Sequence, residues 1–532
     1  MADRLKVLLY YLYYKYRRPF KDREALEKWQ EKKLKKHLDY VAAHAALYSG
    51  KRELQDYPIM DKSFLMAHFD TLNTVGIRRA EAEAFALRAE RERDFAPKLR
   101  GVTVGLSSGT SGRRGIFLVS DGEKNRWAGY ILARFLPGSI LDSLDIAFFM
   151  RADSNLYQAV SSRNIRFHFF DIYRDMEEHK ERLERTKPAI LAGQPSLLLM
   201  LAREREQGNL HISPGTVISI AEVLEREDEL YLKKAFCLEV IHQVYQCTEG
   251  CLASTCARGT LHLNEDIVRI EREYLDRNRF VPIVTDFQRK AQPIIRYRLN
   301  DILVEKESPC GCGSPFLALE KIEGREDDIF VFLDGKGQKK TVFPDFIRRC
   351  VLFAEEERDE GAGEKGIESF TEKRIEGSAG KRSEGAAGKG NEVAAVKRDG
   401  DSAGKRDEGT AGKENEVAAV KRDGDSAEKR DEGTAGKGNE VAAVKRDEDS
   451  AEKCDRNHGR KQDRNHAEYR IEQKRDGSIT VYADFGAEEK AQVLAEFQKL
   501  AQDREFILPE IRFAPYYRET GKKLKRVERE RS

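Results

Sequence analysis

A run of small and hydroxyl-bearing residues has the composition of a phosphate-binding loop. It comprises Ser107, Ser108, Gly109, Thr110, Ser111 and Gly112. Glycines admit backbone conformations that other residues avoid, so backbone amides and hydroxyls here could close around phosphate oxygens. It is not a Walker loop, because Gly112 is followed by Arg113 and not by the lysine of that motif. A solvated Ser/Gly hairpin turn is the alternative, and the loop alone does not decide between the two.

A second candidate group is the pair Thr248-Glu249, which follows a predicted strand at Val240–Tyr245. A carboxylate at a strand end is costly to bury unless a cation accompanies it. Mg²⁺ bound to phosphate groups would be such a cation, and the threonine hydroxyl could add an oxygen ligand. Tyr245, shortly before this pair, offers an aromatic ring. The alternative is a helix cap with an acidic first turn.

Two further motifs follow in order, Pro293–Asp301 (PIIRYRLND) and Gly324–Asp328 (GREDD), and the chain closes with Gly521-Lys522. Together with the loop and Thr248-Glu249, they resemble the adenylate-forming superfamily, and most closely its phenylacetate-coenzyme A ligase-like branch. The resemblance extends from about residue 102 to 344 and returns at the C-terminus. It implies ATP-dependent activation of a carboxylic acid to an acyl-adenylate with release of pyrophosphate. Transfer to a thiol, of coenzyme A or an acyl carrier protein, would follow.

The resemblance also implies a role for each matching residue. The loop would hold the β- and γ-phosphates, and Glu249 would anchor Mg²⁺. Ala221-Glu222 would border the adenine pocket, and Tyr245 could stack on or border adenine. Asp301 and Arg325 would hold the ribose. The alternatives are a helix-start glutamate at Glu222 and, for Asp301, pairing with Arg296 or Arg298.

Lys522 would neutralise charge between the substrate carboxylate and the α-phosphate. Lys523 follows it directly, which leaves the register of the catalytic lysine open. A basic chain end without a catalytic role is the alternative.

Two pairs of soft ligands predict a metal site. Cys256 and His262 form one pair, and Cys310 and Cys312 form the other, with glycines between and after them that allow a tight turn. Three thiolates and one imidazole match a closed, structural Zn²⁺ site. A similar Cys/His and Cys-x-Cys pattern occurs in phenylacetate ligase-like proteins. The alternative is a buried apolar cysteine and a separate reactive turn.

The elements expected to position these residues alternate between helix and strand. The predicted helices are Glu24–Ala46, Ala80–Glu92, Asn125–Leu136, Leu197–Gln207 and Phe343–Phe353. The predicted strands are Leu144–Met150, Ala189–Ala192, Thr216–Ala221, Val240–Tyr245, Ile294-Ile295, Tyr469–Ile471 and Ile479–Phe485. The pattern predicts an α/β protein whose large domain has mostly parallel sheets covered by helices, followed by a small α+β domain. We expect residues 1–100 to be the helical N-terminal part and 101–323 the nucleotide-binding part. Residues 324–532 are expected to form a small mobile domain that rotates about a hinge at Arg325–Asp328.

Residues 355–466 form a low-complexity insertion within that small domain. The string NEVAAVKRD starts at Asn391, Asn415 and Asn439, so the repeat is 24 residues long. Each copy offers only Val-Ala-Ala-Val as apolar material, too little to offset the entropy of ordering the chain. We therefore predict a disordered insertion that enlarges a surface loop.

Composition restricts the partners. The chain has 95 basic and 93 acidic residues, a net charge of +2, so no nucleic-acid partner is expected. Eight cysteines without an export signal indicate a reducing cytoplasm. The apolar run Leu5–Tyr14 is too short to span a bilayer, which takes about 20 residues. It predicts an amphipathic helix on the core, with a membrane-surface helix as the alternative.

A non-catalytic nucleotide-binding or scaffold protein is the rival function.

Overall fold

The computed structural model describes residues 2–17, 20–107, 114–136, 140–150, 164–360, 468–517 and 524–530. All of these belong to one compact unit of the chain. Three predicted features lie outside the described residues: the loop residues Ser108–Gly112, the Lys522-Lys523 pair, and the repeat insertion beyond Glu360.

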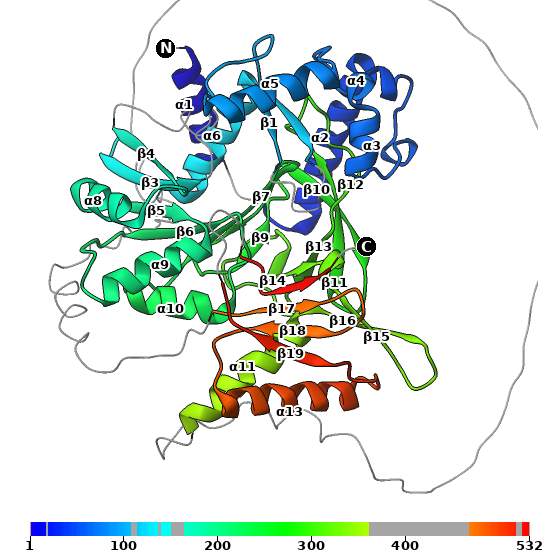
Figure 1. The fold of residues 1–532 in the computed structure, drawn as a ribbon. Coiled ribbons are helices and arrows are strands. Elements are labelled where there is room, and N and C mark those ends of the chain that lie inside the picture. The colour runs from blue at the N-terminus through cyan, green and yellow to red at the C-terminus, as the bar shows by residue number, and fades with distance from the viewer. Residues whose placement is uncertain are drawn as a thin grey trace, which may run out of the picture. The chain divides into compact units, whose positions relative to one another are not determined.

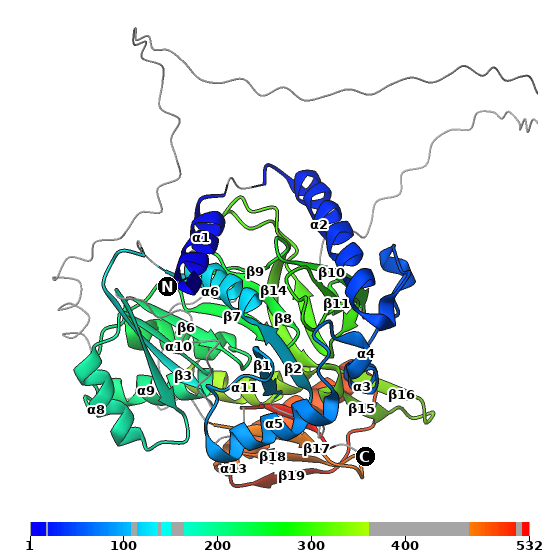
Figure 2. The same cartoon turned by 90° about the horizontal axis from the view of Figure 1, so that it is seen from above.

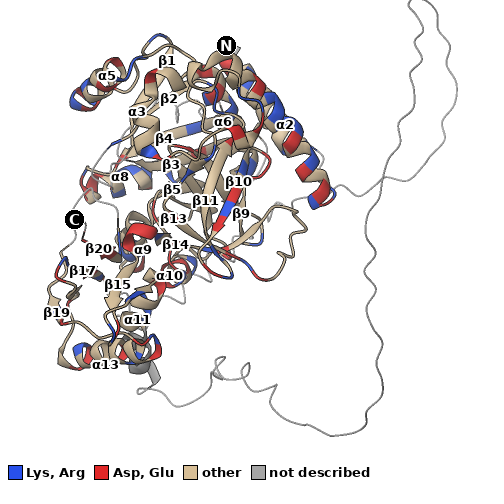
Figure 3. Cartoon of the chain, turned by 90° about the vertical axis from the view of Figure 1, so that its right-hand side faces the viewer, with Lys and Arg blue, Asp and Glu red and all other residues tan. Residues whose placement is uncertain are grey.

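The first hundred residues are helical, as predicted. Their helices are α1 (Ala2–Tyr16), α2 (Arg23–His44), α3 (Lys62–Ala67), α4 (Phe69–Leu72) and α5 (Arg79–Glu92), with 3₁₀ turns at Ala46–Tyr48 and Leu54–Asp56. The carboxylate of Asp22 caps α2 by accepting from the Ala25 amide. Lys, Arg, Asp and Glu alternate along α2 (Figure 3). Among the described helices, none is long and apolar enough to cross a bilayer.

Five parallel strands form one half of a large sheet, in the order β7-β6-β5-β3-β4. They are β3 (Leu144–Met150), β4 (Ile165–Asp171), β5 (Ile190–Gly193), β6 (Thr216–Ile220) and β7 (His242–Cys247). Parallel neighbours need crossover connections, and α8 (Met176–Thr186), α9 (Pro195–Glu206) and α10 (Arg226–Phe236) lie in them. Alternate side chains point to opposite faces: Phe149 packs in the core of α8–α10, while Ile146 packs in the core that includes α6 (Asp121–Phe135) (Figure 1).

The other half of the sheet is antiparallel. Its strands are β8 (Gly250–Thr255), β9 (Leu261–Leu263), β10 (Val268–Tyr274), β11 (Arg279–Asp286), β12 (Tyr297–Arg298), β13 (Asp301–Glu305) and β14 (Ala318–Arg325). Short connections such as the one between β7 and β8 permit only antiparallel pairing. The α/β class is confirmed, but the expectation of mostly parallel pairing holds only up to β7. Ile294-Ile295 is irregular backbone and not the predicted strand; Pro293 precedes it and Arg296 follows with φ +49°.

Strands β1 (Val102–Leu106) and β2 (Ile116–Ser120) form an antiparallel hairpin on either side of the small-residue loop. At its described end, the Ser107 hydroxyl accepts from the Gly115 amide at 2.8 Å. α6 begins at Asp121, earlier than predicted, because Ser120 and Glu123 form a capping box.

The small domain has a hydrophobic core of its own, whose members include Phe330, Ile347, Ile471 and Phe497. Its elements are β15 (Phe330–Leu333), β16 (Lys339–Val342), α11 (Pro344–Glu360), β17 (Arg470–Gln473), β18 (Ile479–Tyr482), α13 (Ala487–Asp503), β19 (Ile511–Ala514) and β20 (Val527–Arg529). The sheet order is β19-β18-β17-β20, with α11 and α13 beside it (Figure 1). The predicted β17–β18 hairpin is confirmed. Helix α11 continues to Glu360, so the first residues of the low-complexity stretch that begins at residue 355 are helical.

Candidate active site

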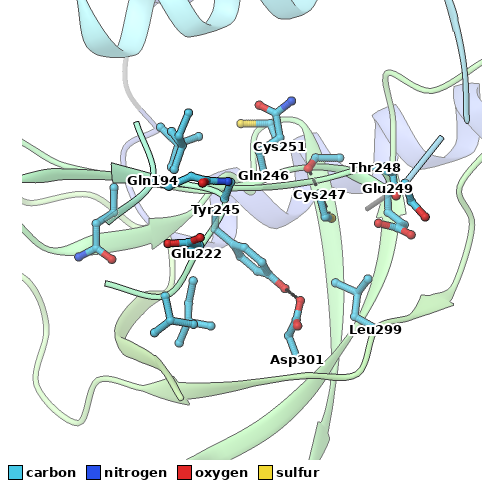
Figure 4. Close-up of a pocket in the computed structure, with 18 of the residues that line it drawn as sticks. Gln194, Glu222, Tyr245, Gln246, Cys247, Thr248, Glu249, Cys251, Leu299 and Asp301 are labelled. Carbon is cyan, nitrogen blue, oxygen red and sulfur yellow. Dashed lines mark hydrogen bonds between the residues drawn. The ribbon is translucent and has the colours of Figure 1, made fainter. Parts of the chain in front are cut away.

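A cavity of about 1360 Å³ collects most of the predicted site residues from distant parts of the sequence. It is bordered by the ends of β6 and β7, the β7–β8 turn, β13, the end of β14 and the segment before β20. The predicted residues that line it are Ser107, Ala221, Glu222, Tyr245, Thr248, Glu249, Asp301 and Arg325. Figure 4 shows the labelled residues Glu222, Tyr245, Asp301, Thr248 and Glu249 within this pocket.

The end of β6 is a strained turn that directs Glu222. Ala221 has φ +68°, which is unusual for a residue with a side chain, and the Glu222 amide donates to the Ile220 carbonyl at 2.9 Å. The Glu222 carboxylate accepts from the Leu524 amide at 3.0 Å and from the Ser196 amide at 3.3 Å. The helix-start alternative is wrong, since α10 begins only at Arg226. Glu222 thus joins the turn after β6 to the C-terminal segment that begins at Leu524.

Asp301 is held by two partners that line the same cavity. The Tyr245 hydroxyl donates to Asp301 Oδ2 at 2.5 Å (Figure 4), and Arg325 Nε lies 3.3 Å from Asp301 Oδ1. Burial, then the charge of Asp301, raises the pKa of Tyr245 well above its ordinary value. Because each carboxylate oxygen can accept more than one hydrogen bond, these contacts orient Asp301 and leave it capacity for a ligand. Stacking of Tyr245 on adenine stays a prediction.

The predicted alternative partners of Asp301 are engaged elsewhere. Arg296 pairs with Glu271 at 2.9 Å, and Arg298 pairs with Glu273 at 2.8 Å and Glu326 at 2.7 Å. The alternative that Asp301 pairs with Arg296 or Arg298 is therefore wrong, because both arginines form ion pairs with glutamates on or beside the antiparallel strands.

Thr248 and Glu249 occupy the tight turn between β7 and β8, so the helix-cap alternative is wrong. Arg289 binds this turn to the hairpin that flanks the small-residue loop: it donates to the Thr248 carbonyl at 2.7 Å and to the Leu118 carbonyl at 3.2 Å. A second, smaller recess is lined by Ser107, Thr248 and Glu249 together. The loop's described end and the acidic turn are therefore neighbours, as a site for phosphate and a cation requires.

Gly250 allows the turn to approach a buried carboxylate. A Cβ added at Gly250 would lie only 2.8 Å from Asp286 Oδ2. Asp286 lines the cavity and is buried, and burial raises its pKa to about 6, against the opposing effect of the Gln288 amide that donates to it at 2.7 Å. No motif in the sequence pointed to this residue.

Replacing Asp286 by asparagine will remove a loss of stability that the wild-type protein undergoes as the pH rises from about 4 to about 6. A carboxyl group whose pKa is raised on folding stabilises the protein below its unfolded pKa of about 4, and this contribution is lost as pH rises through about 6. Asp286→Asn should thus stabilise the protein by roughly 2–3 kcal/mol at pH values above about 7 and change little at about pH 4. Scanning calorimetry across this range measures it. If the difference in Tm between Asp286→Asn and the wild type were the same at about pH 4 and above about pH 7, the raised pKa assigned to Asp286 would be contradicted.

Sequence reasoning also missed an apolar lobe of the cavity. Trp127, Ile131 and Phe135 from α6 face Phe148 and Phe167 from β3 and β4 across it. At its polar end the Trp127 indole N–H donates to Gln246 Oε1 at 3.0 Å. The helical spacing of the α6 side chains was visible in the sequence, but it predicts a buried face without saying that a cavity lies against it.

A further pair missed by the sequence joins the two ends of the small domain. Lys525 Nζ lies 3.2 Å from Asp328 Oδ1, and both residues line the cavity. Asp328 follows the predicted hinge residue Arg325 within one 3₁₀ turn (Glu326–Asp328). The segment that follows Lys522 is thereby held against the predicted hinge.

The four predicted soft ligands come together apart from the cavity. Their ligand atoms all lie within 4.8 Å of one another, and none of the four residues lines the cavity. Cys256 Sγ is 3.8 Å from Cys310 Sγ, and Cys312 Sγ is 3.5 Å from His262 Nε2. His262 Nδ1 lies 3.0 Å from the Phe316 carbonyl, a contact that turns Nε2 toward the thiols. The alternative of two unrelated cysteine features is wrong.

The Cys256–Cys310 and Cys312–His262 distances match those between the ligands of a tetrahedral ion. Zn–S bonds of about 2.3 Å and Zn–N bonds of about 2.0 Å at tetrahedral angles separate two sulfurs by about 3.8 Å and a sulfur from a nitrogen by about 3.5 Å. Burial, with the neighbouring Cys310 and Cys256, raises the pKa of Cys312 to about 11. The pKa of the adjacent Cys310 is lowered instead, because the effect of burial is outweighed by hydrogen bonds, that with Thr260 first. Gly313 supplies the tight turn with φ +74°.

Solved structures of other proteins have the same fold as this chain. The chain has the fold of the adenylate-forming ligases. One solved structure with this fold is 2-hydroxyisobutyryl-CoA ligase in the postadenylation state in complex with 2-HIB-AMP. It is 13% identical, covers 96% of this chain and 90% of its own, and has a TM-score of 0.55. The same ligase with R3-HIB-AMP is 12% identical over 96% of this chain and 89% of its own, with a TM-score of 0.54. No protein-family model and no curated protein matches the chain.

Proposed function

We propose that the protein is an ATP-dependent ligase that activates a carboxylic acid. A carboxylate oxygen of the acid attacks the α-phosphorus of ATP, the bond to pyrophosphate breaks, and an acyl-adenylate forms. A thiol of coenzyme A or of a carrier protein then attacks the acyl carbon, and AMP leaves. The observation that carries the proposal is the convergence of Glu222, Glu249, Asp301 and Arg325 on one cavity in this fold.

The nucleotide would occupy the polar side of the cavity. Asp301 suits the two ribose hydroxyls because it is a two-oxygen acceptor that Tyr245 and Arg325 already orient. Ala221-Glu222 would border adenine. The phosphates would reach the loop that begins at Ser107, beside Thr248 and Glu249. Mg²⁺ held at Glu249 would supply charge neutralisation for them.

The acyl group would occupy the apolar lobe between α6 and the sheet. Its described walls are apolar and aromatic, and they include Trp127, Phe135, Phe148 and Phe167. Burial of a charged group there would be costly, so the lobe favours acids whose chain or ring is uncharged.

We assign a structural Zn²⁺ to the Cys256, His262, Cys310 and Cys312 cluster, because four protein ligands leave no open coordination position. This site also supports the phenylacetate-coenzyme A ligase-like branch. A cytoplasmic location belongs to the same proposal and rests on the described cysteines that form no disulfide, which are Cys247, Cys251 and Cys350 together with the three cluster cysteines. Cys237, which is disulfide-bonded, is the exception.

ATP–pyrophosphate exchange, screened over aryl and fatty acids, tests the function. The rival, a nucleotide-binding or scaffold protein without catalysis, predicts nucleotide binding and no acid-dependent exchange with any of them.

Glu249→Gln should weaken exchange at limiting Mg²⁺ by at least about tenfold, since loss of a metal ligand lowers metal affinity. Excess Mg²⁺ should restore part of the rate. Glu320→Gln is the matched control, because Glu320 pairs with Lys306 on the surface and does not line the cavity. Equal exchange by wild type and Glu249→Gln at every Mg²⁺ concentration would remove Glu249 from the cation site.

A further inference from the structure

The N-terminal helix α1 is apolar on two opposite faces. Its inward face carries Val7 and Tyr11, which are 6% and 1% exposed and pack against α6. Five other apolar residues are exposed: Leu5 57%, Leu9 57%, Leu12 40%, Tyr13 44% and Tyr16 69%. Their spacing of i, i+4, i+7, i+8 and i+11 places them on one helical stripe, opposite the buried face. A surface helix normally turns a polar face outward, so the fold does not account for this stripe.

Packing fixes the direction of this outward stripe. Gly129 of α6 lies so close to α1 that an added Cβ would stand 2.8 Å from both the Val7 carbonyl and the Tyr11 amide. Asn125 donates to Asp3 at 2.8 Å, and Gln288 donates to the Tyr14 hydroxyl at 2.9 Å. Figures 1 and 2 both show α1 beside α6. With its inner face bonded in this way, α1 presents the stripe as a fixed surface.

The charges beside the stripe are mainly basic. Arg4 and Lys6 are exposed on either side of Leu5, and Lys6 Nζ lies 3.6 Å from the carboxylate of Asp3, the acidic residue of the helix. At the other end of the helix, the half-buried Lys15 donates to the Leu136 carbonyl at 3.3 Å, and the exposed Lys21 is followed by the exposed Asp22. An apolar stripe with basic flanks matches a surface that is apolar below and anionic above, which is the interface of an anionic bilayer.

We propose that α1 docks the protein on anionic membrane surfaces through Leu5, Leu9, Leu12, Tyr13 and Tyr16. The helix lies in the plane of the interface, with the stripe among the acyl chains and with Arg4 and Lys6 at the lipid headgroups. The apolar and electrostatic contributions act together, since a short apolar face alone binds weakly and reversibly. This inference does not rest on the proposed ligase activity, and its test needs no turnover.

Flotation of the full chain with vesicles tests the docking. The protein should float with phosphatidylglycerol/phosphatidylcholine vesicles, much less with pure phosphatidylcholine, and less at high salt because screening weakens the lysine and arginine contacts. Leu5→Gln/Leu9→Gln should lower the partition coefficient by roughly 25-fold, about fivefold for each half-exposed leucine. Arg4→Gln/Lys6→Gln should remove most of the preference for the anionic lipid.

Leu230→Gln is the matched control, because Leu230 is a leucine of similar exposure, 54%, on α10. It should float like the wild type, and all variants should keep the wild-type Tm because the changed side chains are exposed. Equal flotation of wild type and Leu5→Gln/Leu9→Gln, or none of the wild type with anionic vesicles, would overturn the proposal. So would a wild-type dimer in solution that the double variant converts to a monomer, since the stripe would then bind a second copy of the chain.

Discussion

Lys522→Ala will lower ATP–pyrophosphate exchange by about 10²- to 10³-fold, the usual loss for one contact made to charge developing in a transition state. Lys522 itself lies outside the described residues, but the segment that follows it is anchored at the cavity. The Leu524 amide donates to Glu222, and Lys525 pairs with Asp328. Lys522 precedes Leu524 by two residues in the sequence, so we expect its side chain to act at this cavity. ATP binding should change far less.

The same variant should keep the second half-reaction. The small domain has its own core and is joined to the large domain by the predicted hinge at Arg325–Asp328. Thiol transfer from a supplied acyl-adenylate would use a rotated small domain, with Lys522 turned away, so its rate should persist.

Two neighbouring lysines serve as controls for Lys522. Lys523→Ala should retain exchange, and Lys525→Ala should lose the contact to Asp328 with a smaller effect on exchange. Loss of exchange in Lys523→Ala, with a normal Lys522→Ala, would move the register by one residue. Normal exchange in both would refute the assigned mechanism.

The purified protein should contain about one Zn²⁺ per chain, and Cys310→Ser should lose it. Binding of structural zinc is worth on the order of 10 kcal/mol in small zinc domains. Only part of that should appear here, because β9, which carries His262, is also paired with β8 and β14. A fall in Tm together with loss of zinc, measured by calorimetry and metal analysis, is the expected result.

Cys350→Ser controls for the general cost of changing a cysteine. Cys350 is buried in the small-domain core and stands outside the cluster, so its replacement can lower stability without releasing zinc. A wild-type protein that is metal-free and as stable as the zinc-loaded form would contradict the assignment of the cluster.

The motifs were readable in the sequence because each depends on local chemistry. A carboxylate after a strand, a Cys-Gly-Cys turn and a glycine-rich loop have a restricted set of uses wherever they occur. Local hydrophobic patterns were equally informative: Leu144–Met150 was predicted with the bounds that β3 has, and the β17–β18 hairpin turns at Gly477 with φ +87°. These features depend mainly on residues that lie close to them in the sequence.

Pairing between distant residues was decided by the tertiary structure alone. From the sequence, Arg296 and Arg298 were possible partners of Asp301. In the structure they form ion pairs with Glu271, Glu273 and Glu326. Asp301 pairs with Arg325 instead. Charge–charge contacts depend on which strands become neighbours, and that depends on the packing of the whole domain.

The sequence by itself determined the order of the site motifs, the four soft ligands and the alternation of apolar residues that makes strands and helices. The tertiary structure decided what those residues face. It turned Trp127 and Phe135 toward a cavity, brought Asp286 beneath the acidic turn and left Leu5 and Leu9 outward. The physical reason is that an apolar residue is equally suited to a core, a ligand pocket or an exposed stripe, and only the position of the neighbouring elements distinguishes them.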